Sequence, residues 1–418
     1  MSQPSRDGPP MKIGYVVKRY PRLSETFILD EILGLEDAGL EVAIHSLLQP
    51  NDGRFHEDIS RVKAVARYLP TAAQSVFGAF RALRDVGISK DAAALDRAIA
   101  FLEQVPEQRR GTLLVQALHL ADEARKKGLE HLHAHFMSSP AQTTYLAHLF
   151  SGIPFSVTAH AVDIYGPNVD PAVVREIAEG AVAVVTVCEA NRDHLRDLVG
   201  ASSRIEVIYN GVSLDELSGN GLRDPGLVLA VGRLVEKKGY HILLEACRLL
   251  RDRDVEFRCV LVGDGKQREE LLDQRRMLEI DDCVEMPGAT SRREVLRWMR
   301  RARVFAAPCV TAADGNQDAL PTVLLEALSI GLPVVSTPVA GIPEIVDDGV
   351  EGLLTPPGDA AALADAVQCL LTDDGVWARM AAAGPAKAAD RFDRTKNLPK
   401  LIELFRQSAR GRVLEAVQ

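Results

Sequence analysis

Several features that would place this chain in a specialised class are missing from its sequence. No apolar stretch reaches 18 residues, so no segment is predicted to span a bilayer as a helix. The first ten residues, MSQPSRDGPP, lack the apolar stretch of a signal peptide and are expected to form a disordered leader. The net charge of −9 over 418 residues argues against nucleic acid as a partner.

Two cofactor and redox signatures are also missing. The six cysteines form no C-x-x-C pair, and several stand inside apolar strand-like or helix-like runs. This scatter predicts buried, reduced thiols in a cytoplasmic protein. No G-x-G-x-x-G sequence follows a predicted strand, so the dinucleotide-binding fingerprint is not present.

What the sequence does contain is a long alternation of short apolar strands and amphipathic helices. The stretch KIGYVV is followed by SETFILDEILGLEDAG, a predicted helix with Ser24 as its N-cap and Gly39 at its end. The same βαβ rhythm continues to about residue 356, and it predicts α/β domains with doubly wound parallel sheets.

The length and one polar connector, SGNGLRDPG, divide the chain into two similar halves. We predict a leader at 1–10, a first domain at 11–211 with a helical insertion near 59–128, and a second domain at 212–393. The terminal helix, 394–418, lies beyond the last strand and could pack on either domain. Two facing domains of this kind bind ligands in the cleft at the carboxyl ends of their strands.

Cations and acids follow strands in the second half. In VGRLVEKKG, Arg233 and Lys238 bracket a loop that suits a diphosphate, although a solvated basic loop is the simpler alternative. In DALPTVLLEALSIGLPVV, Asp318 and Glu326 stand before and inside a helix predicted at Pro321–Ile330. Their carboxylates suit the hydroxyls of a nucleotide sugar, and capping or an exposed charge is the alternative. The neighbours of Glu326 are apolar, so its carboxylate needs a partner.

Histidines follow or occupy strands in the first half. The stretch HLHAHF puts His131, His133 and His135 on one face of a strand, where cleft lining or packing is favoured over a metal site because no further ligand stands nearby in sequence. In the stretch FSVTAHAVDIY, His160 stands at the end of the predicted strand. It could donate a hydrogen bond to a developing charge, or it could be a structural histidine.

Together, these motifs resemble the retaining glycosyltransferases of family 4, which have the two-domain GT-B fold. The resemblance covers about residues 11–390 and rests on SETFI, HAHF, FSVTAHAVDIY, YNGV, VGRLVEKKG, LVGDG and DALPTVLLEALSIGLPVVST. The subgroup is similar to bacterial exopolysaccharide enzymes of the colanic-acid type. The fold implied is two Rossmann-like domains across a cleft, with the terminal helix returning to the first domain.

The resemblance implies a role for each matching residue. His160 and Asp318 are the catalytic candidates, with Asp318 at the first acid of the family's E-x7-E pattern, where it is one methylene shorter than Glu. Arg233 and Lys238 would bind the donor diphosphate, and Glu326 the ribose. The other expected site residues are Ala319, Leu320, Pro321 and Thr322 around the donor sugar and phosphate, Gly263, Asp264, Gly265 and Ala289 around the base, and Ser24, Glu25, Thr26 and Asp163 on the acceptor side.

The activity implied is a retaining hexosyl transfer without a metal or other cofactor, from a UDP- or GDP-sugar to a saccharide or lipid-linked acceptor, in bacterial polysaccharide or glycolipid biosynthesis. The alternatives on the same fold are a nucleotide-sugar epimerase, a phosphorylase and a non-catalytic nucleotide-sugar-binding protein. No lysine motif for pyridoxal phosphate is evident, which argues against the phosphorylase. The sequence assigns no oligomeric state.

The expected location is the cytoplasm, with one question left open about the membrane. The stretch Val62–Gly87 combines basic residues with Val76, Phe77, Phe80 and Leu83 at near-helical spacing. It is interpreted either as an interfacial helix at the inner face of the plasma membrane or as a helix packed on its own domain.

Overall fold

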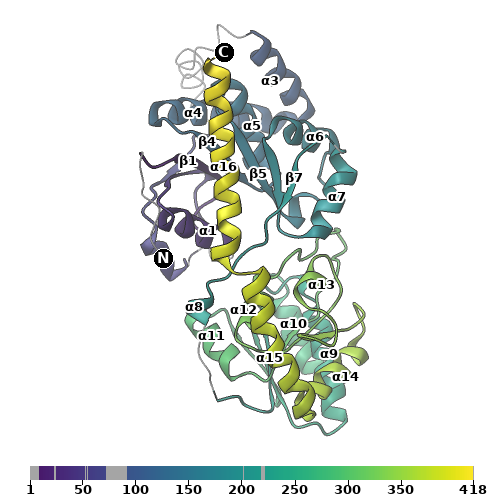
Figure 1. The fold of residues 1–418 in the computed structure, drawn as a ribbon. Coiled ribbons are helices and arrows are strands. Elements are labelled where there is room, and N and C mark those ends of the chain that lie inside the picture. Colours follow the sequence, from purple (N-terminus) through teal and green to yellow (C-terminus); the bar gives the residue numbers. More distant parts are fainter. Residues whose placement is uncertain are drawn as a thin grey trace, which may run out of the picture.

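The computed structural model describes residues 9–417 except 23, 24, 52, 54, 72–91, 201 and 218–221. The described chain forms two α/β domains, one above the other in Figure 1, with the C-terminal helix lying along the first domain. The predicted fold class, two Rossmann-like domains with doubly wound parallel sheets, is confirmed.

The first domain is built on a seven-stranded parallel sheet with the order β3-β2-β1-β4-β5-β6-β7. Its strands are β1 (Lys12–Arg19), β2 (Glu41–Leu48), β3 (Ala66–Tyr68), β4 (His131–His135), β5 (Phe155–Ala159), β6 (Ala183–Thr186) and β7 (Ile205–Val207). Every strand expected from the sequence is present, and β3 is an addition. This edge strand has only three residues, and Tyr68 is 43% exposed, so it carries no alternation of apolar and polar residues.

Helices cover both faces of this sheet. They are α1 (Thr26–Asp37), α3 (Ala92–Gln104), α4 (Glu107–Lys127), α5 (Ser139–Ser151), α6 (Pro171–Gly180) and α7 (Glu189–Val199), with the short 3₁₀ helices η1 (Glu57–Arg61) and η4 (Ala161–Asp163). One core packs α3 to α7 around Phe101 and Phe155, and another packs α1 against Ile13 and Ile44. Of the stretch 62–87, the described residues form β3 and its flanks, while Val76–Leu83 lie outside the described residues.

The second domain repeats the design with a six-stranded parallel sheet in the order β10-β9-β8-β11-β12-β13. Its strands are β8 (Leu227–Val231), β9 (Arg258–Val262), β10 (Val284–Gly288), β11 (Val304–Ala307), β12 (Val334–Ser336) and β13 (Gly352–Leu354). Its helices are η5 (Glu236–Lys238), α9 (Tyr240–Asp252), α10 (Arg268–Met277), α11 (Arg292–Arg301), α12 (Thr322–Ser329), α13 (Ile342–Ile345), α14 (Ala360–Thr372) and α15 (Asp374–Arg391).

Two chain crossings run side by side between the domains. The first passes through Val212, next to the short helix α8 (Leu214–Leu217), and the second leads from α15 into α16 (Arg394–Val417). They are tied together because Val212 N donates to Phe392 O (2.8 Å) and Arg394 N donates to Val212 O (3.1 Å).

Helix α16 returns to the first domain and packs beside α1 (Figure 1). Its buried residues join the core on that face of the sheet: Leu401, Ile402, Leu404 and Phe405. Burying one such side chain stabilises a fold by about 1.5–3 kcal/mol, so this helix is an integral part of the first domain.

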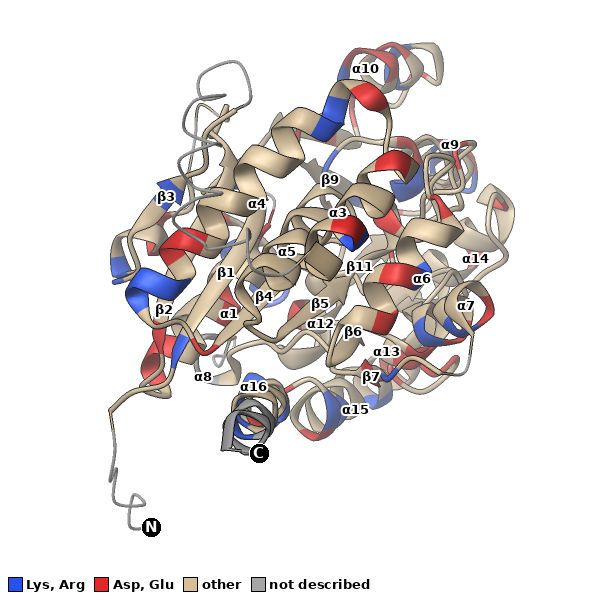
Figure 2. Ribbon diagram, turned by 90° about the horizontal axis from the view of Figure 1, so that it is seen from above, with Lys and Arg blue, Asp and Glu red and all other residues tan. Residues whose placement is uncertain are grey.

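Charged residues of both signs lie mainly on the outer helices, such as α7 and α10, while the strands β5, β6 and β11 carry none (Figure 2). This distribution fits parallel strands that are buried on both faces. Among the described helices, none is both long enough and apolar enough to cross a membrane.

Candidate functional site

The strand order of the second sheet reverses between β8 and β11, the position at which open parallel sheets bind ligands. The loops after these two strands contact each other there. Val310 N donates to Lys237 O (2.9 Å), and a Cβ added to Gly239 would lie 1.9 Å from Pro308 O. Because Gly239 also has a φ of +65°, only glycine fits this approach.

The loop contact creates a cluster of two ammonium groups and one carboxylate. Lys237 Nζ lies 2.8 Å from Asp318 Oδ1, and Lys238 Nζ lies 2.5 Å from Asp318 Oδ2. Burial opposes ionisation of Asp318, but the two lysines outweigh it and lower its pKa. Burial likewise acts against the charge of Lys238, but Asp318 outweighs it and raises the pKa. Asp318 and Lys238 are therefore both charged at neutral pH.

The predicted phosphate and sugar residues surround this cluster. Arg233 is exposed after β8, and within the described residues it has no carboxylate partner. Helix α12 begins at Thr322, one residue after the predicted start, and the segment Ala319–Pro321 before it is buried. The site thus combines an exposed guanidinium, two lysines and a helix N-terminus, all of which favour a phosphate.

The carboxylate of Glu326 was expected to need a partner, and the structure shows that this partner is Arg292, which was not identified from the sequence. Arg292 Nη2 donates to Glu326 Oε1 at 3.4 Å, and Nη1 lies 4.0 Å from Asp58 Oδ2 of the first domain. Arg292 begins α11 and was not singled out, because nothing in its neighbourhood in sequence points to residue 326. It joins the ribose candidate to the opposite domain.

The predicted base-binding loops follow β9 and β10. Gly263 N donates to Gly288 O (3.1 Å), next to the half-buried Ala289. A Cβ added to Gly263 would lie 1.8 Å from Gly232 O, so the missing side chain makes room for the loop after β8. Asp264 holds the turn, because its Oδ1 accepts from Gly265 N at 2.8 Å.

His160 lies across from the lysine cluster, at the end of β5. It is 8% exposed, and its ring contacts the tilted rings of Phe27 and Phe136, whose centroids lie 4.8 and 4.6 Å from its own. Burial, followed by His135 and by the charge of Lys237 on the other domain, lowers its pKa well below the ordinary value. His160 is therefore a neutral imidazole that feels the charge of the donor-side cluster.

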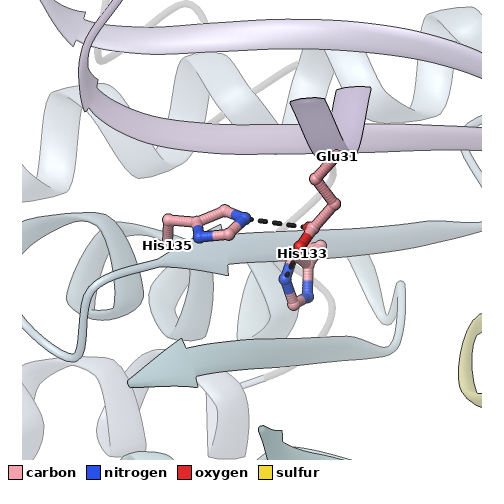
Figure 3. A group of neighbouring side chains, drawn as sticks. All are labelled: Glu31, His133 and His135. Atoms are coloured by element: carbon pink, nitrogen blue, oxygen red, sulfur yellow. Dashed lines mark hydrogen bonds and ion pairs between the residues drawn. The ribbon is translucent and has the colours of Figure 1, made fainter. Parts of the chain in front are cut away.

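His160 contacts His135, which belongs to a cluster with Glu31 and His133 that the sequence brought together only in part; Figure 3 shows these three side chains. His135 Nδ1 lies 3.2 Å from His160 Nε2, and His135 Nε2 lies 3.1 Å from Glu31 Oε1. Tyr15 also donates to Glu31 Oε1. Glu31 comes from α1, more than a hundred residues from His135 in sequence, so the fold supplies an acid that the histidines lack among their neighbours in sequence.

The geometry of Glu31, His133 and His135 also bears on metal binding, since their ligand atoms lie within 4.8 Å of one another. Each already has hydrogen-bond partners: His133 contacts Ser156 Oγ (2.7 Å) and Thr158 Oγ1 (3.0 Å). A saturated set of partners favours a hydrogen-bonded network over a metal centre.

The predicted acceptor-side residues are distributed around the start of α1 and the end of β5. Thr26 begins α1, Glu25 lies 3.5 Å from Arg22, and Ser24 lies outside the described residues. Asp163 accepts hydrogen bonds from the main-chain N–H groups of Met137 and His160.

Asp163 is 7% exposed, and burial raises its pKa to about 7 against the opposing effect of those N–H groups. By accepting the hydrogen bond from the main-chain N–H of His160, Asp163 fixes the turn that carries His160.

Comparison with known proteins identifies the chain's relatives. Residues 24–216 match the family model described as Glycosyltransferase Family 4, and residues 225–373 match Glycosyl transferases group 1. A putative colanic acid biosynthesis glycosyltransferase of Escherichia coli K12, WcaL, is 30% identical over 381 residues, which cover 85% of this chain and 89% of WcaL. The chain belongs to glycosyltransferase family 4.

Other relatives of this family 4 chain agree. The amylovoran biosynthesis glycosyltransferase AmsK of Erwinia amylovora is 34% identical over 190 residues, covering 46% of this chain and 47% of AmsK. The crystal structure of Anabaena Alr3699/HepE with UDP and glucose superposes with a TM-score of 0.72 at 19% identity, covering 94% and 98% of the two chains, which supports the GT-B fold.

Proposed function

We propose that this chain is a retaining, metal-independent glycosyltransferase that moves a hexosyl group from a UDP- or GDP-sugar to a saccharide or lipid-linked acceptor in bacterial exopolysaccharide biosynthesis. The names of the colanic acid and amylovoran relatives support the process. A nucleotide-sugar donor is supported by the crystal structure of HepE with UDP-glucose and by a relative from Mycolicibacterium smegmatis, a GDP-mannose-dependent mannosyltransferase. No observation favours the epimerase, the phosphorylase or the non-catalytic protein.

The observation that carries the proposal is the charged cluster at the switch point between β8 and β11. The carboxylate of Asp318 pairs with both Lys237 and Lys238 and neutralises part of their charge. A donor diphosphate would take over the ammonium of Lys238, and Arg233 would reach it from the exposed loop after β8. Asp318 would then turn from the lysines toward the hydroxyls of the donor sugar.

The same residues would stabilise the transition state. As the bond between C1 of the sugar and the phosphate oxygen breaks, its electron pair stays on the diphosphate, and negative charge grows beside Arg233 and Lys238. Fixed cations in this position can do what a divalent metal does in other transferases. The start of α12 adds the positive end of its dipole.

Retention is proposed from the resemblance to the retaining enzymes of family 4, and a front-face path is favoured over a double displacement because no carboxylate among the described residues of the cleft is placed as a nucleophile. Asp318 is paired with lysines, and Asp163 is enclosed by main-chain N–H groups. The acceptor hydroxyl would attack on the face that the diphosphate leaves. Its oxygen would bond to C1 and its proton would pass to the departing phosphate oxygen, while neutral His160 hydrogen-bonds the sugar or the phosphate.

The acceptor and the location are also part of the proposal. We place the protein in the cytoplasm, with a peripheral contact to the inner face of the plasma membrane if the acceptor is lipid-linked. Flotation with vesicles of anionic lipid tests this contact, and protein that stays at the bottom of the gradient at low salt would remove it.

The function is tested by incubating the protein with UDP-, GDP- and ADP-sugars, with and without octyl glycosides, in EDTA. We expect a glycoside product only when the acceptor is present, and NMR of its anomeric proton should show the configuration of the donor. Sugar conversion without an acceptor would support an epimerase instead. An inverted product would contradict retention, and loss of activity in EDTA would contradict metal independence.

A further inference from the structure

A pocket separate from the donor site lies in the first domain. It is near the position where the strand order of that sheet reverses, between β1 and β4, as the second sheet does between β8 and β11. It is open between the ends of β1 and β2, the helix α4 and the start of α5. Its lining includes Lys18 from β1, Leu48 from β2, Arg109 and Gln116 from α4, and Ser139 from α5. Switch points between strands are where α/β domains bind small ligands, so this position alone suggests a binding role.

The charge of the pocket is unbalanced. Arg109 is half-buried, and its Nη2 donates to two neutral groups, Ser139 Oγ (2.6 Å) and Gln142 Oε1 (2.9 Å). Burial lowers its pKa. Neither Arg109 nor the exposed Lys18 has a carboxylate partner in the described part of the chain, and no Asp or Glu lines the pocket.

This imbalance calls for an explanation in a protein whose net charge is −9. Removing a guanidinium from water is costly unless an anion accompanies it. Both hydrogen bonds of Arg109 to Ser139 and Gln142 come from Nη2 and go to neutral groups, and the exposed Lys18 lines the same pocket. Two cations converging on one space are the usual arrangement for a phosphate or carboxylate.

We propose that this pocket, called the Lys18–Arg109 pocket below, binds an anionic group of the acceptor, either a phosphate or a carboxylate. The inference rests on the proposed glycosyl transfer and adds to it the chemical class of the acceptor. The two sources of such a group are the phosphate that links a saccharide to a lipid and the carboxylate of an acidic sugar.

The position of the pocket supports an acceptor group rather than a donor group. His160 follows β5, and β4 separates β5 from β1, which carries Lys18. Since neighbouring strands are about 4.8 Å apart, the charged group would bind roughly 10 Å to the side of His160. The anion and the accepting hydroxyl would therefore belong to different units of the acceptor.

The remaining walls suit a sugar beside that anion. Leu47, Leu48 and Leu113 offer apolar surface, while Gln108 and Thr112 offer hydrogen-bonding groups. Gln116 is committed elsewhere, because its Nε2 donates to Leu47 O (2.8 Å) and fixes the floor.

The test uses the full chain with its donor site filled by whichever of UDP or GDP binds. Binding of glucuronate, glucose 6-phosphate and uncharged glucose is measured by ligand-observed NMR. The variants are Arg109→Ala, Arg109→Lys and Lys18→Ala, and Lys126→Ala is the matched control because it removes a cation from the exposed face of the same helix. Lys18 is exposed, so Lys18→Ala should fold even if Arg109→Ala does not.

We expect at least one charged probe to bind more tightly than glucose, and Arg109→Ala and Lys18→Ala each to weaken that probe by about 10- to 100-fold. Arg109→Lys should retain part of the affinity, and Lys126→Ala all of it. Preference for glucose 6-phosphate indicates a phosphate-linked acceptor, and preference for glucuronate indicates an acidic sugar.

Equal binding of charged and uncharged probes, no binding of any probe, or an unchanged affinity in both Arg109→Ala and Lys18→Ala would overturn the inference. The proposed function fails separately, if no nucleotide sugar binds or no transfer occurs with any acceptor. Anion binding in a protein that binds no nucleotide sugar would also overturn the assignment to an acceptor.

Discussion

Replacing Asp318 with asparagine would disturb the charge balance of the cluster formed by Asp318, Lys237 and Lys238. The carboxylate lies 2.8 Å from Lys237 Nζ and 2.5 Å from Lys238 Nζ, and the three side chains are only 11–14% exposed. Removing one partner of a buried pair costs about 3–5 kcal/mol, and some solvent access here favours the lower end, ~3 kcal/mol. The variant should therefore fold but be clearly less stable.

The pH dependence of this loss follows from the shifted groups. The pKa of Asp318 is lowered from 3.8, so its contribution is complete above about pH 4 and disappears as pH falls toward the folded value. The pKa of Lys238 is raised from 10.5, so its contribution is complete below that pH and disappears above it. Between about pH 5.5 and 9, a window roughly one and a half units inside both limits, the difference between wild type and Asp318→Asn should be constant.

The assay is urea unfolding of both proteins across that window, with Asp314→Asn as the control because Asp314 is an exposed acid of the same loop. Asp318→Asn should also bind a nucleoside diphosphate more tightly, by about fivefold or more, since the lysines no longer have a competing carboxylate. Wild-type stability in Asp318→Asn, or weaker diphosphate binding, would refute the idea that Asp318 holds Lys237 and Lys238 and competes with a diphosphate for them.

Three further predictions concern other parts of the site. Glu31→Gln should lower kcat by about tenfold with the donor KM unchanged, because Glu31 orients His135 and through it His160; a change in KM alone would contradict this. Gly263→Ala should cost at least about 2 kcal/mol in urea unfolding and weaken donor binding, because the new Cβ would meet Gly232 O, whereas the open position Gly53→Ala should be neutral. Asp163 keeps a proton that the unfolded chain releases, since its pKa is raised from 3.8 to about 7, so stability should fall from pH 4 to 7 and Asp163→Asn should remove that fall.

The parts of this structure that follow from local sequence were predictable. Parallel strands buried on both faces, such as β6 and β8, are short runs of Val, Ala and Leu, and helix α12 differs from its predicted bounds by one residue at each end. Strand-end positions also place Arg233, Lys238 and Asp318 at one edge of a sheet, because the carboxyl ends of parallel strands share that edge.

The partners of these residues depend on contacts between distant segments, and sequence patterns do not predict them. Glu31 reaches His135 only because α1 packs on the face of the sheet toward which the side chain of His135 points. Arg292 reaches Glu326 because the first residue of α11 lies against the middle of α12. Lys237 stood next to Lys238 in sequence, but its contact with Asp318 required the loops after β8 and β11 to meet.

The proposed function requires that the switch point between β8 and β11 binds the diphosphate of a nucleotide sugar. The most direct measurement is calorimetric titration of UDP-, GDP- and ADP-sugars into wild type, Arg233→Ala and Lys238→Ala, with circular dichroism to confirm that each variant is folded. We predict that one donor binds wild type and that each substitution weakens it by about 10- to 100-fold. Full affinity in both folded variants would contradict the claim.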